Sequence, residues 1–326
     1  MLKTGLIGVG YLGKIHLKLL KEIQGFEFIG IYDVNTEHCK LMSEQFNVPF
    51  FEDINALIDS SDVLDIVTPS QSHFEIAQKC IKKGKHVFIE KPITQTVEEA
   101  VQLLNLSQEA GVKVQVGHVE RFNPAFIAAK PLINKPQFIE IHRLAQYNPR
   151  GTDVSVTFDL MVHDLDLLLN IVPSNIKKIS ANGVNLVSTA PDIVNARIEF
   201  DNGVVANITT SRIALKNMRK FRVFQDGAYV SIDLLEKATE IVRIRNAANN
   251  TGNFVLKPGN NLPNKELVFE HPVILPTNAI KEELKAFNLS IVNKQKPAVS
   301  IEEAISVLKL AYAIDEKIGE SVIKFS

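Results

Sequence analysis

One apolar segment carries three ionisable side chains at helical spacing. Asp159, His163 and Asp166 are four and three residues apart, and most of the residues between them are Leu, Met and Val, so a helix would present all three on one face. A carboxylate one turn from an imidazole can fix its tautomer and support general-base catalysis. A buried structural network has the same spacing, so both interpretations stay open. Zinc ligation is weaker, because a helix supplies only part of a shell and no cysteine joins it; we expect no metal.

A second candidate is the sequence Glu90-Lys91-Pro92, directly after the strand-like run His86–Ile89. Lysine is usually a solvated surface charge. Lys91, however, follows a strand, and parallel sheets bind their ligands at the carboxyl ends of strands. Pro92 has no amide hydrogen, and a cis bond before it would set the direction of Lys91. We therefore expect Glu90 and Lys91 to face a ligand.

Near the N-terminus, Gly8, Gly10 and Gly13 form a GxGxxG pattern between an apolar strand and an amphipathic helix. Gly8 permits the tight turn, Gly10 lets the backbone approach a pyrophosphate, and Gly13 lets the helix pack closely on the strand. The amides at the helix start, where Tyr11 and Leu12 lie, would then face the phosphates. This pattern predicts a dinucleotide site.

An acidic residue follows the second strand at the spacing expected for such a site. Asp33 lies 20 residues after Gly13, where a carboxylate binds the adenosine ribose diol. A carboxylate there would repel a 2′-phosphate, and no arginine follows it immediately, so we expect NAD rather than NADP. The alternative is a solvated turn residue.

The next strand also ends in polar residues. Thr68, Pro69 and Ser70 follow it, and a helix begins near Ser72 or His73. Thr68, Pro69, Ser70 and His73 could line the cofactor site, because they lie at a carboxyl strand end. Ser72 could equally be only a helix cap.

The elements that position these residues alternate through the first third of the chain. Helical segments separate short β-branched runs, which predicts right-handed crossovers and a doubly wound parallel sheet of the Rossmann type. These runs are Thr4–Val9, Phe26–Tyr32, Val63–Thr68, His86–Ile89 and Val112–Val116.

Beyond about Phe122 the pattern changes to helices and hairpins. Asp201-Asn-Gly203 and Gln225-Asp-Gly227 each join two alternating runs, which indicates an antiparallel sheet. Residues 247–263 are rich in Asn and Gly and predict a loop. The helices are expected at Asn123–Ile133, Phe158–Val172, Ala279–Val292 and Ile301–Ser321. We expect a Rossmann domain over residues 1–122 and an α+β domain over 123–326.

Composition limits the partners. The chain has 326 residues, 45% hydrophobic residues and a formal net charge of −1, which favours two folded domains and gives no long-range attraction to nucleic acid or anionic membranes. Two cysteines cannot form a disulfide framework. The start of the sequence lacks the basic and apolar sections of a signal peptide, and no apolar run is long enough to span a bilayer. We expect a cytoplasmic protein.

Together these motifs resemble the Gfo/Idh/MocA family of oxidoreductases, which includes glucose–fructose oxidoreductase and inositol dehydrogenases. The matching segments follow one another in the family's order and span nearly the whole chain. They are Gly8/Gly10/Gly13, Thr68-Pro69, Glu90-Lys91-Pro92 and Asp159…His163-x-x-Asp166. One departure is Met161, where the family usually has glycine two residues before the histidine; it could narrow the pocket and affect substrate size.

The resemblance implies NAD(P)-dependent oxidation of a ring hydroxyl. It also implies a large, mostly antiparallel sheet in the second domain, through which members often form homodimers or homotetramers. Lys91 would donate a hydrogen bond to the reacting oxygen, and His163 would accept the proton with Asp159 orienting it. Which of Lys91 and His163 takes the proton stays open. Asp166 would bind substrate or support the site.

Two stretches, Gly117–Pro124 and Phe158–Asp166, look most like the branch that oxidises the C3 hydroxyl of UDP-N-acetylglucosamine. Arg121 and Asn123 are then candidates for substrate binding, although an interdomain salt bridge is an equal alternative for Arg121. Arg143, Arg150 and Arg212 are further candidates for a pyrophosphate. A free sugar, inositol or another polyol is the alternative substrate, and a non-catalytic nucleotide-sensing regulator is a second alternative.

Overall fold

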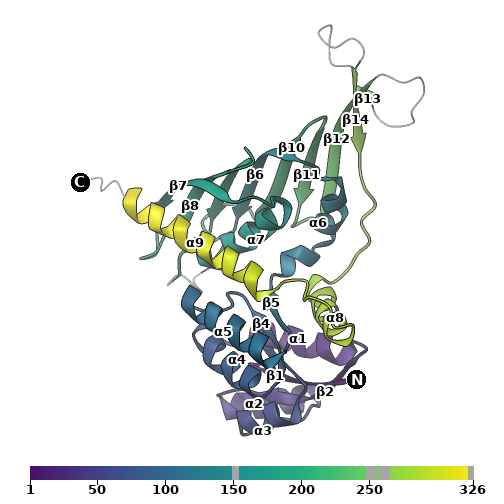
Figure 1. Cartoon of the computed structure of the whole chain (residues 1–326), viewed down its shortest axis with the longest axis vertical. Helices are drawn as coiled ribbons and strands as arrows, with labels where there is room; N and C mark the ends of the chain where they lie inside the picture. Colours follow the sequence, from purple (N-terminus) through teal and green to yellow (C-terminus); the bar gives the residue numbers. More distant parts are fainter. Residues whose placement is uncertain (149–153, 247–254, 257–264, 322–326) are drawn as a thin grey trace. The chain divides into compact units, whose positions relative to one another are not determined.

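The computed structural model describes residues 1–148, 154–246, 255–256 and 265–321. The chain divides into two compact units, one of Met1–Val119 with Asn278–Lys309 and one of Glu120–Thr277 with Leu310–Ser326 (Figure 1). The first unit therefore includes a C-terminal segment that the sequence places in the second domain. No helix in the described ranges is long and apolar enough to cross a membrane.

The first unit is built on a five-stranded sheet in the order β2-β1-β3-β4-β5, and every neighbouring pair is parallel. This confirms the predicted Rossmann-type sheet. Its elements are β1 (Leu2–Ile7), α1 (Tyr11–Glu22), β2 (Phe26–Tyr32), α2 (Thr36–Phe46), α3 (Ile54–Ser60), β3 (Val63–Ile66), α4 (His73–Lys82), β4 (His86–Glu90), α5 (Val97–Ala110), β5 (Val114–Gly117) and α8 (Ala279–Val292).

The register aligns the carboxyl ends of these strands. Ile7 of β1 lies opposite Ile66 of β3, and Ile66 lies opposite Ile89 of β4. Glu90 then lies opposite Gly117 of β5. The strand order reverses between β1 and β3, the position at which doubly wound sheets bind ligands. The residues that follow these strands therefore meet at one edge of the sheet.

Helix α8 completes the core of the first unit, although it comes from the far end of the chain. Leu284 and Phe287 are buried in one cluster with Leu20 of α1 and Phe88 of β4. The rings of Phe88 and Phe287 are 6.0 Å apart between centroids. The sequence correctly predicts the helix at Ala279–Val292, but apolar periodicity does not say which of two cores it joins.

The second unit is built on a nine-stranded sheet in the order β13-β14-β12-β11-β10-β6-β9-β8-β7. It is antiparallel except for the pair β6 and β9, which confirms the predicted architecture. Its strands are β6 (Pro136–Leu144), β7 (Ile176–Val184), β8 (Ile193–Phe200), β9 (Val205–Ser211), β10 (Met218–Gln225), β11 (Ala228–Asp233), β12 (Ala238–Asn246), β13 (Val255–Leu256) and β14 (Lys265–Glu270).

Both hairpins predicted from Asx-Gly turns are present, β8 with β9 and β10 with β11. The loop expected over 247–263 lies outside the described residues, apart from Val255–Leu256, which pair with β14 as a strand. Strand β6 was not predicted, although it lies between the two hairpins.

Short helices cover one face of this sheet, with α6 (Pro124–Ala129) and α7 (Val162–Ile171) lying against it (Figure 1). The Asn123 side chain caps α6 by accepting the backbone N–H of Ala125. Helix α7 is preceded by one π-helical turn over Thr157–Met161, so the single helix predicted there is two segments. Helix α9 (Ile301–Ser321) has the predicted bounds.

Candidate functional site

The glycine loop after β1 has the geometry that a dinucleotide requires. Gly8 has φ +94°, and a Cβ there would lie 2.6 Å from the Val67 carbonyl oxygen. A Cβ on Gly13 would lie 2.1 Å from the Gly8 oxygen, so only glycine allows α1 to pack this closely. A Cβ on Gly10 would meet nothing within 4 Å, which leaves the backbone open to an approaching group. The turn and packing roles expected of Gly8 and Gly13 are therefore present.

The start of α1 is available to an anion. Gly10 is its N-cap and provides no side-chain hydrogen bond to the first turn. Tyr11 is 81% exposed, and Leu12 is partly buried beside it. Uncapped amides at a helix start bind phosphate groups, and the helix dipole favours their charge. The loop and helix start fit the pyrophosphate of a nicotinamide dinucleotide.

Asp33 lies directly after β2 with its carboxylate oriented by backbone amides. One oxygen accepts the N–H of Val9 at 2.9 Å, and the other accepts the N–H of Asn35 at 3.0 Å. The residue is partly exposed, so its remaining acceptor capacity is available to a ribose diol. His38, which sequence reasoning did not single out, lies beside it with Nε2 3.1 Å from the Val9 oxygen.

The segment after β3 is tied down by hydrogen bonds. The Ser72 hydroxyl donates to Thr68 Oγ1 at 2.8 Å and to the Pro69 oxygen at 2.9 Å, and makes no cap bond to α4. Ser70 is partly buried and Pro69 is exposed. His73 is 1% exposed, with Nε2 2.8 Å from the Thr68 oxygen and Nδ1 2.8 Å from the Pro92 oxygen. Both ring nitrogens of His73 thus face backbone carbonyls.

Glu90 and Lys91 lie at the end of β4, which neighbours β3, the strand before Thr68; β1, the strand before the glycine loop, is on the other side of β3. Both are partly buried, and the Lys91–Pro92 peptide bond is cis. Glu90 Oε1 is 3.3 Å from His16 Nε2. His16 Nδ1 is in turn 2.9 Å from Asp65 Oδ2. The sequence analysis did not identify this group of charged residues. The signal that could have found it is the position of His16 and Asp65 among apolar residues, in elements that the sequence pattern predicts to be buried.

These two carboxylates keep His16 charged. Burial by itself lowers the pKa of His16, but Asp65 and Glu90 more than compensate and raise the pKa to about 10. The imidazolium makes a hydrogen bond to Asp65 through Nδ1 and an ion pair with Glu90 on the side of Nε2.

In the second unit, the π turn changes the spacing on which the shared face was predicted. Asp159 lies within the turn and His163 in the first turn of α7, and both are partly buried. A π turn has a wider spacing than an α-helix, so a separation of four residues no longer means one face. Such turns are frequent at functional sites. Met161 lies in the same turn and is 0% exposed.

Asp166 forms a bidentate ion pair with Arg121. Arg121 Nε donates to one oxygen at 2.8 Å and the terminal nitrogen donates to the other at 2.7 Å. The Asp166 side chain is 0% exposed and that of Arg121 is 8% exposed. Both residues of this pair belong to the second unit.

A second buried ion pair connects β6 to α7. Arg143 is 3% exposed and donates to Asp164 at 2.7 and 2.9 Å and to Glu120 at 3.1 Å. The carboxylates raise the pKa of Arg143, against the effect of burial. Asn123 donates to Glu120 Oε2 and to the Leu234 oxygen, both at 2.9 Å. Arg143 and Asn123 are therefore engaged within the fold.

The other candidate cations differ in their surroundings. Arg212 is 5% exposed and donates to the Val154 oxygen, with Asp192 3.8 Å away. Arg150 lies outside the described residues. Within the described ranges, no group of three His, Cys, Asp or Glu side chains could hold a metal ion.

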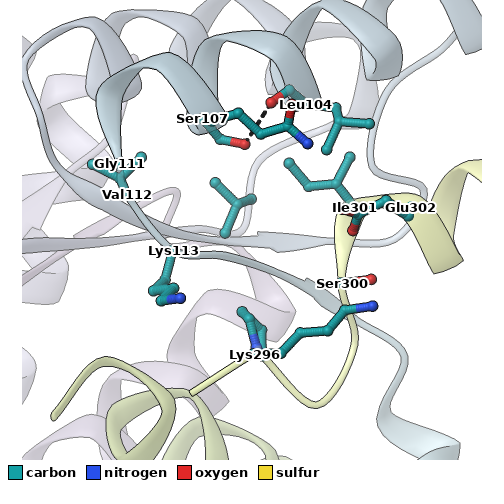
Figure 2. A pocket seen from close by; sticks show the side chains of 12 residues that line it. Leu104, Ser107, Gly111, Val112, Lys113, Lys296, Ser300, Ile301 and Glu302 are labelled. Carbon is teal, nitrogen blue, oxygen red and sulfur yellow. Dashed lines mark hydrogen bonds between the residues drawn. The ribbon is translucent and has the colours of Figure 1, made fainter. Parts of the chain in front are cut away.

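A pocket of about 440 Å³ lies at the opposite end of β5 from Gly117 (Figure 2). Figure 2 shows α5 on one side of it and the segment from Lys296 to Glu302 on another. Lys113 lines it just before β5 begins, and Gly111 lines it just after α5 ends. None of the predicted site residues is among its lining residues. It is separate from the sheet edge at which the predicted cofactor residues meet.

Comparison with known proteins agrees with this arrangement. Residues 2–118 match the model of an oxidoreductase family with an NAD-binding Rossmann fold (GFO_IDH_MocA), and residues 136–230 match the GFO/IDH/MocA C-terminal domain. The chain is 34% identical over 241 residues to UDP-N-acetylglucosamine 3-dehydrogenase of Acidithiobacillus ferrooxidans, covering 74% of this chain and 76% of that protein. It is 25% identical over 338 residues to myo-inositol 2-dehydrogenase of Thermotoga maritima, covering 98% and 97%.

A solved structure of the UDP-N-acetylglucosamine 3-dehydrogenase from A. ferrooxidans superimposes on this chain with a TM-score of 0.89 and 29% identity, covering 98% of each chain. One conclusion about the family follows from the glycine loop, the aligned strand ends and the two matched domains. The chain belongs to the GFO/IDH/MocA family of oxidoreductases and is a dehydrogenase that uses a nicotinamide cofactor.

Proposed function

We propose that this protein oxidises the C3 hydroxyl of a UDP-amino sugar such as UDP-N-acetylglucosamine, using NAD. The observation that carries the proposal is the sheet edge, where the glycine loop, Thr68 and Lys91 follow the three consecutive strands β1, β3 and β4. The similarity to a protein named UDP-N-acetylglucosamine 3-dehydrogenase supports this choice of substrate. Asp33, with its oxygens oriented by two amides, supports NAD over NADP.

A nicotinamide cofactor supplies the acceptor for the hydride that leaves the carbinol carbon as the alcohol becomes a ketone. In the proposal, the Lys91 ammonium donates a hydrogen bond to the reacting oxygen and stabilises its developing negative charge. His163 accepts the hydroxyl proton at an imidazole nitrogen, and Asp159 orients the ring. The alternative proton acceptor is Lys91 in its neutral form. The ion pairs at Asp166 and Asp164 support α7, the helix that carries His163.

Lys91→Met tests the chemistry, because it removes the amine and keeps the length of the side chain. We expect kcat to fall by about a thousandfold, as for other transition-state hydrogen bonds, while NADH affinity stays within twofold. Lys113→Met is the matched control, since Lys113 lies just before the neighbouring strand β5, at the opposite end of the sheet. NADH emission can be followed without tryptophan interference because the chain has no Trp. Unchanged turnover in Lys91→Met would refute the catalytic role of Lys91, whereas no turnover of any tested sugar by the wild type would favour a nucleotide-sensing regulator.

Substrate choice is tested with NAD and a panel of UDP-N-acetylglucosamine, free N-acetylglucosamine and myo-inositol. We expect turnover with the nucleotide sugar. The full-length similarity to a protein named myo-inositol 2-dehydrogenase makes a free polyol the second candidate. Turnover of only the free sugar or inositol would refute the nucleotide-sugar proposal and support that candidate.

We also propose that two or four copies assemble through the large sheet. Phe138, Phe224 and Tyr229 stack side by side across β6, β10 and β11, with centroid distances of 5.6 and 4.8 Å. Phe224 is 38% exposed and Ile244 on β12 is 47% exposed. Exposed apolar surface of this kind is typical of interfaces between copies. Light scattering should give a dimer or tetramer, and Phe224→Glu should shift it toward monomer; a wild-type monomer would refute the assembly.

A further inference from the structure

Two buried histidines contact the residues on either side of Lys91. His16, from α1, is 0% exposed and contacts Glu90, the residue before Lys91, at 3.3 Å. His73, from α4, is 1% exposed and contacts the Pro92 oxygen, the residue after Lys91, at 2.8 Å. Both helices belong to the first unit. The backbone of Lys91 is therefore flanked by two side chains that come from elsewhere in the sequence.

The contact of His16 immobilises the Glu90 carboxylate. Asp65, 1% exposed, lies 2.9 Å from the other ring nitrogen and so fixes the plane of the imidazole. The Glu90 carboxylate also accepts the backbone N–H of Lys91 at 3.2 Å. On its other side, a Cβ on Gly117 would lie 2.8 Å from Glu90 Cδ, so the carboxylate fills the space that this glycine leaves. The Glu90 carboxylate therefore contacts His16, the Lys91 amide and Gly117 on three sides, and these contacts fix its orientation.

His73 joins the two segments that follow β3 and β4. Its second ring nitrogen is 2.8 Å from the Thr68 oxygen, so one imidazole connects the Thr68-Pro69 segment with the Lys91-Pro92 segment. Buried contacts to backbone carbonyls fix main-chain direction rather than bind a ligand. Both ring nitrogens face carbonyl oxygens; burial lowers the pKa of His73, and the neutral ring that this favours donates its one N–H to one of the two.

We propose that His16 and His73 are positioning residues that hold the backbone of Lys91 from both sides, so that its amine is presented in one direction. The catalytic consequence rests on the proposed function of Lys91. Neither histidine is a catalytic residue, because each is buried and acts through a neighbour. A misplacement of about 1 Å in a reacting group can lower the rate a hundredfold, so residues that hold Lys91 in place affect the rate without touching the substrate.

The first experiment does not depend on activity. Site-resolved labelling of lysine amines, quantified by mass spectrometry, is applied to wild type, His16→Gln, His73→Gln and His73→Asn. We expect the labelling rate at Lys91 to change at least threefold in each variant, while rates at the exposed Lys40 and Lys79 stay constant. His86→Gln is the control: His86 lies on β4 as Glu90 does, but at the other end, where it accepts the Lys113 amide.

An unchanged rate at Lys91 in the folded variants overturns the proposal. Folding is checked by thermal melting, and if His16→Gln does not fold, the two His73 variants decide the outcome. A uniform change at every lysine also overturns it, since that would indicate general loosening rather than positioning.

The second experiment is a double-mutant cycle with Lys91→Met. If the histidines act through Lys91, each Gln variant lowers kcat about tenfold with little change in the KM for NAD, and has no further effect when Lys91 is already Met. The same factor in both backgrounds would show a merely structural role and refute the inference. Full turnover by Lys91→Met alone would instead refute the proposed function, and the labelling result would still decide the positioning proposal.

Discussion

Replacing Arg143 by Met should show how much the buried ion pairs stabilise the second unit. Methionine keeps most of the apolar stem but removes the guanidinium that donates to Asp164 at 2.7 and 2.9 Å and to Glu120 at 3.1 Å. Asp164 is 1% exposed and Glu120 is 6% exposed, so the variant leaves two buried carboxylates without their main cation. Removing one partner of such a pair costs about 3–5 kcal/mol of unfolding free energy. We expect a loss in this range for Arg143→Met.

The loss should depend on pH in a defined direction. Burial raises the pKa of the Asp164 carboxyl, and the variant lacks the guanidinium that opposes this shift. A carboxyl whose folded pKa lies above its unfolded pKa favours folding at low pH, and that contribution is lost as pH rises through the folded pKa. The deficit of Arg143→Met against wild type should therefore be larger at pH 8 than at pH 5.

The assay is urea unfolding followed by circular dichroism at both pH values, and two further variants are measured in the same way. Adding Asp164→Asn to Arg143→Met should recover part of the loss, because the buried charge disappears with its partner. Arg222→Met is the control, since Arg222 pairs with Glu140 at 3.2 Å on the same sheet but is 27% exposed, and should cost under about 1 kcal/mol. A loss below about 1 kcal/mol for Arg143→Met, or an equal deficit at both pH values, would refute the reasoning.

Three further outcomes are expected. Asp33→Ser should move the NAD-to-NADP preference about a hundredfold toward NADP, because a like charge near the 2′-phosphate is removed; an unchanged ratio of binding constants would contradict this. Gly10→Ala should melt like wild type but bind NADH at least tenfold more weakly, whereas Gly13→Ala should lose about 1–3 kcal/mol of stability because its Cβ meets backbone. The amides of residues 186–188 lower the pKa of Asp192 to about 2 despite its burial. Asp192→Asn should therefore be less stable than wild type at pH 7, with the difference narrowing as pH falls from about 4 to 2; a constant difference would argue against this assignment.

Local signals in the sequence account for most of the first unit. Gly8 and Gly13 are required by turn and packing geometry that a short motif encodes, and the strand that ends at Glu90 is visible from its apolar run. In the parallel pair β4 and β5, the register places Glu90 opposite Gly117. This edge is predictable because each part of it depends on a few adjacent residues.

The second unit is harder to predict from the sequence, because its buried charged residues pair with residues from distant segments. Arg143 follows the buried Ile139 and Ile141 at a spacing of two residues and so lies on the same face of β6, which is a sequence signal that places its charge inside. Its partner Asp164 lies on α7, and periodicity does not link the two. The π turn before α7 likewise has no simple signature, so the relative directions of Asp159 and His163 could not be deduced from their spacing of four residues.

The position of α8 has a consequence for how the chain is made. During synthesis, residues 1–119 leave the ribosome first, but the cluster around Leu20 and Phe88 is completed only by Leu284 and Phe287. The nucleotide-binding unit must therefore wait, with part of its apolar surface uncovered, until more than four-fifths of the protein has been translated. Such a nascent chain is a natural client for chaperones that bind exposed apolar segments. A stop codon anywhere before α8 removes not a peripheral tail but part of the first core to be translated.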